Sequence, residues 1–99
     1  MLKAVKTDPQ TQQNKIVRKL QARRVDYLNE SEEVRINLLI TELMLEAVDR
    51  DPMNADLYQR LMDGYITERE FIDNLKDVSE TLRYQLAMAF LDSHAIAGA

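Results

Sequence analysis

The feature that most constrains this chain is its scarcity of residues that break helices. Its 99 residues contain only two glycines and two prolines, whereas a protein built from sheets needs many turns, which draw on both residue types. The apolar residues between the breaks recur at spacings of three and four, the period of an amphipathic helix. The sequence therefore predicts an all-α fold, a compact bundle of about four helices in a single domain.

Local start and stop signals set the expected bounds of these helices. Pro9 and Pro52 each follow an Asp that can cap a helix, and proline suits the first helical position because its missing N–H needs no partner there. Thr67 and Glu70 form a capping box, in which each side chain satisfies a backbone N–H of the other residue. The expected helices span residues 9–28, 32–49, 52–63 and 68–94, and residues 1–8 and 95–99 are expected to be frayed.

Two of these helices are expected to shape the fold. The helix over 32–49 is apolar around most of its circumference, so we expect it to be central and contacted on several sides. Its polar stripe is narrow and consists of Arg35, Glu42, Glu46 and Asp49. A continuous apolar stripe from Phe71 to Ala89 predicts one long helix over 68–94, with Ser79 as the position where it could break.

The residues that usually carry chemistry are scarce. The chain has no cysteine, which excludes disulfides, thiolate nucleophiles and cysteine-ligated metals. His94 is the only histidine, and no Ser–His–Asp set, HExxH motif or glycine-rich phosphate loop is present. We therefore expect neither an enzyme nor a cofactor or metal. The polar start and the lack of an apolar run long enough to cross a membrane favour a cytoplasmic protein.

The net charge of −4 conceals a marked asymmetry. Residues 1–24 hold seven basic residues and one acidic residue, a net charge of +6, and the rest of the chain carries −10. Such a division suggests a charged partner, or attraction between the two parts within the fold or in a dimer. A nucleic-acid partner would use the basic side of the helix over 9–28. That face consists of Lys15, Arg18, Lys19 and Arg23.

The run DGYITEREF, which starts at Asp63, resembles the second half of an EF-hand calcium loop. In that resemblance Asp63, Gly64 and Glu70 take loop positions five, six and twelve. Positions one and three fall on Gln59 and Leu61, where the family has carboxylates or Asn. Because calcium needs six to eight oxygen ligands, we expect no calcium site here.

Residues 45–75 carry a second resemblance. The matching positions are Leu45-Glu46-Ala47, Asp51-Pro52, Gly64-Tyr65-Ile66-Thr67, Ile72 and Leu75. Together they resemble the small helical antitoxins that restrain Fic-domain adenylyltransferase toxins. The resemblance implies that Glu46 is the inhibitory glutamate, which pairs with a toxin arginine and blocks productive ATP binding. This chain has Glu42 where the family has Ser or Thr, and Ala47 where it has Gly.

These observations favour a small protein-binding module that acts by occlusion, as an inhibitor, antitoxin or adaptor of the phage, plasmid or bacterial accessory type. The expected partner is another protein with a basic site, and the expected binding residues are Glu42, Glu46, Asp49 and Asp56. One alternative is a nucleic-acid-binding regulator. Another is a structural homodimer or assembly factor that uses the apolar C-terminal end, with Leu86 and Phe90 as the interface.

Overall fold

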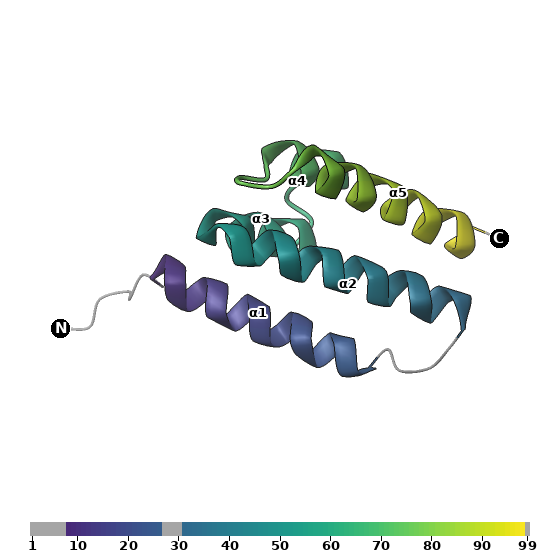
Figure 1. Cartoon of the computed structure of the whole chain (residues 1–99), viewed down its shortest axis with the longest axis horizontal. Coiled ribbons are helices and arrows are strands. Elements are labelled where there is room, and N and C mark those ends of the chain that lie inside the picture. The colour runs from purple at the N-terminus through teal and green to yellow at the C-terminus, as the bar shows by residue number, and fades with distance from the viewer. Residues whose placement is uncertain (1–7, 27–30, 99) are drawn as a thin grey trace.

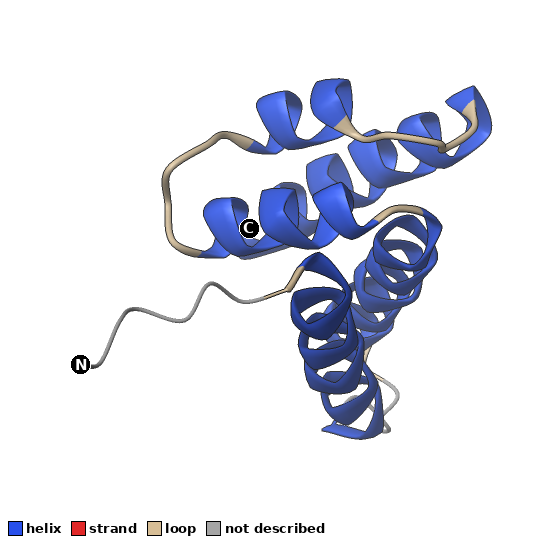
Figure 2. Cartoon of the chain, turned by 90° about the vertical axis from the view of Figure 1, so that its left-hand side faces the viewer, coloured by secondary structure: helices blue, strands red, loops and turns tan. Residues whose placement is uncertain are grey.

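The computed structural model describes residues 8–26 and 31–98, and in these residues it contains five α-helices and no strand (Figure 1). The expected all-α bundle is confirmed, although with five helices in place of about four. The helices are α1 (Pro9–Asp26), α2 (Glu32–Arg50), α3 (Pro52–Met62), α4 (Glu68–Asn74) and α5 (Glu80–Ala97). In Figure 2, loops and turns join α2 to α3, α3 to α4 and α4 to α5.

Side chains cap the start of four helices. The hydroxyl of Ser31 accepts the N–H of Val34 at the start of α2, and a carboxylate oxygen of Asp51 accepts the N–H of Met53 at the start of α3. Ser31 is thus the cap of α2, and the alternative, Asn29, lies outside the described residues. The expected capping box opens α4, and Ser79 caps α5. Each cap satisfies a backbone N–H that has no partner within its helix.

The single long helix expected over 68–94 is wrong, because the chain leaves helical geometry between Leu75 and Ser79. The amide of Asn54, whose side chain is wholly buried, holds the backbone of this break. Its Nδ2 donates to the carbonyl of Lys76 at 2.8 Å, and its Oδ1 accepts the Lys76 N–H at 2.8 Å. Nδ2 also donates to the carbonyl of Ala47 at 2.7 Å, near the end of α2.

Two further features complete the break between α4 and α5. Asp77 has a φ of +56°, a left-handed conformation that helices exclude. The guanidinium of Arg83 donates to the carbonyl of Leu75 at 2.7 Å and also to the carbonyl of Ile72. Arg83 thus donates to two carbonyls at the end of α4, one of which, that of Ile72, also accepts the N–H of Leu75.

The core lies between α2 and the helices around it. α2 packs against α1, α3 and α5, as expected for a central helix, and α4 packs against α3 and α5. In Figure 1, α1 and α2 run antiparallel side by side, and α5 runs back along α2. The buried apolar residues include Ile16, Leu20, Met44, Val48, Tyr58, Phe71, Leu82, Leu86 and Phe90. The apolar stripe of the expected long helix thus stays in the core on both sides of the break.

The remaining helix ends differ little from expectation. α1 ends at Asp26, and the rest of its expected span lies outside the described residues. α5 continues to Ala97, beyond its expected end at residue 94, and the Gly98 N–H closes it by donating to the carbonyl of His94. Gly64 follows α3 with a φ of +81°, which favours glycine at this turn.

Candidate protein-binding site

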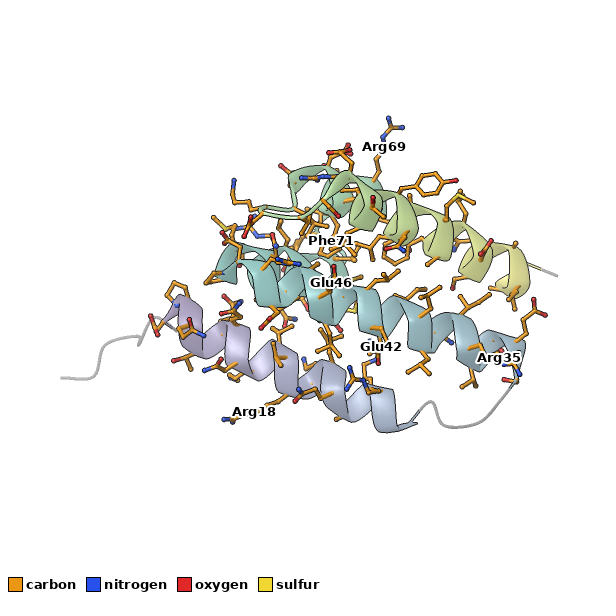
Figure 3. All side chains as sticks on the ribbon, in the orientation of Figure 1. Arg18, Arg35, Glu42, Glu46, Arg69 and Phe71 are labelled. Atoms are coloured by element: carbon orange, nitrogen blue, oxygen red, sulfur yellow. The ribbon has the colours of Figure 1, made fainter. Side chains whose placement is uncertain are left out.

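Three of the four acidic residues expected to bind a partner line one groove. Glu42, Glu46 and Asp49 follow one another on α2 at spacings of four and three, which places them on the same side of the helix. Figure 3 shows Glu42 and Glu46 on α2, above α1. The groove between α1 and α2 has a volume of about 370 Å³ and is lined by Val17, Gln21, Arg24, Glu42, Leu45, Glu46 and Asp49.

Within this groove Glu42 already has a cation. The guanidinium of Arg24 forms a two-pronged pair with it, in which Nη2 donates to Oε2 at 2.8 Å and Nε donates to Oε1. The hydrogen bonds to this carboxylate raise the pKa of Arg24 above its usual value, and the neighbouring negative charge acts in the same direction. Arg24 therefore keeps its charge, and the pair joins α1 to α2 across the groove.

Glu46 and Asp49 differ from Glu42 in forming no ion pair among the described residues, although Arg24 lines the same groove. Both side chains are exposed, and within residues 8–26 and 31–98 neither forms an ion pair. Val17 and Leu45 line the same groove and are partly buried. The groove thus combines two partly buried apolar side chains with two carboxylates that form no ion pair among the described residues.

Asp56 does not belong to this groove. It lies on α3, where its carboxylate accepts a hydrogen bond from Nε of Arg60 at 2.8 Å, one helical turn away. The structure therefore brings together Glu42, Glu46 and Asp49 and leaves Asp56 apart. Arg24 is the charged groove residue that the sequence prediction missed. Its partner Glu42 lies on another helix, so no local spacing indicates the contact.

The expected basic face on α1 is narrower than predicted. Lys15, Arg18 and Lys19 are exposed, and Arg18 points away from the bundle in Figure 3. Arg23 is instead partly buried, and its Nη1 donates to the hydroxyl of Tyr58 at 3.3 Å. Arg23 therefore contacts α3, and three of the four basic side chains form the exposed face.

The apolar interface expected at the C-terminal end needs correction. Leu86 has no exposed surface and Phe90 is only 8% exposed, because both belong to the core of the chain itself. The large apolar side chains that α5 does expose are Tyr84, Met88 and Leu91. Beside them, a groove of about 390 Å³ lies between α4 and α5, and its apolar lining includes Ile72, Phe90 and Leu91.

The other chemical features have structural roles in this fold. His94 pairs with Glu68 through Nε2 and Oε1 at 2.7 Å, which links α5 to the start of α4. Gln59 and Leu61, the first and third positions of the EF-hand-like run, are helical residues of α3. In the described part of the chain, no group of three or more acidic, His or Cys side chains could hold a metal ion. No helix there has the length and apolar character needed to cross a membrane.

Comparison with known protein families, with characterised proteins and with solved structures gives no match to this chain.

Proposed function

We propose that this chain binds another protein by receiving a basic segment in the groove between α1 and α2, and that it acts by covering that segment. Glu46 and Asp49 are the residues that hold the partner. The observation that carries the proposal is a pair of exposed carboxylates that form no ion pair among the described residues and lie in one groove with two apolar side chains. An inhibitor, an antitoxin or an adaptor would each use this binding of a basic segment in the groove.

The chemistry of the groove fits a lysine or arginine side chain. Such a side chain has an apolar stem that packs on groups such as Val17 and Leu45, and a charged head that reaches a carboxylate. An arginine could contact the carboxylate of Glu46 through two parallel hydrogen bonds, the geometry that Arg24 already adopts with Glu42. Glu46 is also the residue to which the resemblance to Fic antitoxins assigns the arginine contact, and its exposure is compatible with that role.

Affinity capture from a lysate of the host organism tests the proposal. The tagged wild type, the variant Glu46→Lys/Asp49→Lys and the control Asp63→Lys/Asp92→Lys are compared by mass spectrometry. The control carries the same change of charge at two exposed residues outside the groove. We expect one protein to be retained by the wild type and the control and lost by the groove variant. Retention by all three folded proteins would refute the proposed role of the groove.

A second candidate function rests on α1. Lys15, Arg18 and Lys19 are exposed and form no ion pair within the described residues, so they are available to phosphates. Nuclease treatment of the same lysate separates the two candidates. Loss of every captured protein after nuclease, together with binding that weakens steeply with salt, would favour nucleic acid over a protein partner.

A further inference from the structure

A pocket separate from the groove between α1 and α2 lies at the C-terminal end of α3, where Tyr58 and Met62 line it. Each of the five helices contributes to its lining, and none of the residues that line the groove does. Its volume is about 170 Å³. Liquid water takes up about 30 Å³ per molecule, so the pocket has room for about six waters, or for an organic molecule of fewer than about ten non-hydrogen atoms.

The polar side chains of this pocket have hydrogen-bonding capacity that the chain does not use. Tyr58 is only 1% exposed, and its hydroxyl oxygen accepts from Nη1 of Arg23, but no acceptor within the described residues takes the hydroxyl proton. Ser93 is half-buried, and its hydroxyl forms no hydrogen bond in the same part of the chain. Glu68 contacts His94 through Oε1, and its Oε2 has no partner there. Because a buried donor without an acceptor is unfavourable, a bound acceptor would stabilise this arrangement.

The lining carries one positive and one negative side chain, those of Arg23 and Glu68. α1, which holds Arg23, and α4, which begins at Glu68, do not pack against each other in the described part of the chain. The two charges therefore reach the pocket from different sides. Most other lining residues are apolar, namely Leu20, Ile40, Met44, Met62 and Phe90. Such a lining favours a ligand with one negative group, one positive group and an apolar body.

We propose that this pocket binds a small apolar α-amino acid. The carboxylate of the ligand accepts hydrogen bonds from the guanidinium of Arg23 and from the hydroxyl of Tyr58. Its ammonium donates to Oε2 of Glu68 and to the hydroxyl of Ser93, and its side chain packs on the apolar walls. Valine, leucine and methionine keep within the size limit of the pocket, whereas phenylalanine exceeds it.

This site does not depend on the proposed function, because the groove that holds Glu46 and Asp49 shares no residue with it. α1 and α5 both pack on α2 and, within the described residues, not on each other. A ligand that contacts Arg23 and Ser93 therefore links two helices that are otherwise joined only through others. Because the ligand binds the folded chain, it also raises Tm as its concentration increases.

An NMR titration of the isotope-labelled wild type with L-valine, L-leucine and L-methionine tests the site. We expect the signals of Met44, Tyr58 and Ser93 to shift, with a dissociation constant between about 10 μM and about 1 mM. Two analogues of leucine separate the roles of its charges. Isocaproate lacks the ammonium and isoamylamine lacks the carboxylate, so each should bind at least about tenfold more weakly than leucine.

Conservative variants test the polar contacts. Tyr58→Phe keeps the ring and removes the hydroxyl, and Glu68→Gln removes the negative charge. Each should weaken leucine binding by about tenfold or more. The matched controls Tyr84→Phe and Glu32→Gln change exposed residues outside the pocket and should bind leucine like the wild type. Circular dichroism checks that each variant is folded, and Ser93→Ala, which removes only a half-buried hydroxyl, replaces Tyr58→Phe if that variant is not.

Three results would overturn the inference. The first is the absence of any shift in the pocket signals with all three amino acids up to about 10 mM, a range that covers weak binding. The second is leucine binding that the folded pocket variants leave unchanged. The third is binding of isocaproate or isoamylamine as tight as that of leucine.

Discussion

Replacing Asn54 by alanine tests how the break between α4 and α5 is held. The side chain of Asn54 is wholly buried and makes three hydrogen bonds to backbone groups of Ala47 and Lys76, each 2.7 or 2.8 Å long. Asn54→Ala removes all three and leaves two carbonyls and one N–H without these partners. A lost hydrogen bond of this kind costs about 1 kcal/mol.

The expected loss for Asn54→Ala is therefore about 2 to 3 kcal/mol in the free energy of unfolding. The lower value applies if water reaches the backbone of Lys76, which is an exposed residue. For a domain of this size, the loss corresponds to a fall in Tm of roughly 10 to 20 °C. Urea denaturation followed by circular dichroism measures the free energy, and thermal denaturation of the same samples measures Tm.

Two companion variants make the test specific. Asn14 is exposed on α1, so Asn14→Ala should change the free energy of unfolding by no more than about 0.5 kcal/mol. Asn54→Asp keeps the oxygen that accepts the Lys76 N–H but cannot donate to the two carbonyls, so it should destabilise at least as much as Asn54→Ala. A loss below about 1 kcal/mol for Asn54→Ala, or a milder effect of Asn54→Asp, would refute the reasoning.

Variants at two further positions, Arg83 and Gly64, test other backbone features of the fold. Arg83→Ala removes the hydrogen bonds to the carbonyls of Ile72 and Leu75 and should cost about 2 kcal/mol in urea denaturation. Arg83→Lys should recover less than half of that loss, because an ammonium lacks the fork that reaches both carbonyls, and full recovery would contradict this. Gly64→Ala should cost about 1 kcal/mol through its φ of +81° alone, since no atom lies within 4 Å of the added Cβ. Gly64→Asn should cost less in the same assay, and equal losses for the two would count against the backbone explanation.

The helix starts could be predicted from the sequence because their signals act within one turn. Ser31 was one of two candidate caps for α2, and Pro52 and the Thr67–Glu70 box marked the starts of α3 and α4 directly. The sequence indicated Ser79 as the position where the long helix could break, and Ser79 caps α5, but no local signal predicted that α4 would end at Asn74. The main contact of the break comes from Asn54, 22 residues before Lys76. The apolar spacing also gave no sign of the break. Leu75 and Leu82 are both buried in the same core, so they keep a helical spacing across the break.

The candidate site, like the fold, could be predicted only in part from the sequence. The sequence placed Glu42, Glu46 and Asp49 on one side of a helix, and the structure places all three in one groove. The sequence could not distinguish Glu42 from Glu46 and Asp49, because the partner of Glu42, Arg24, lies on another helix and 18 residues away in the chain. The pairing of Asp56 with Arg60 did have a local signal, since residues four apart on a helix are neighbours.

The contact between Asn54 and Lys76 also bears on how the chain is degraded. Within residues 8–26 and 31–98, Lys76 is the only lysine or arginine outside a helix, which makes it the natural target of a trypsin-like protease. Both its N–H and its carbonyl are held by Asn54, so a protease cannot take up this stretch of backbone until the segment detaches. The rate of cutting after Lys76 therefore follows the fraction of molecules in which that segment is open.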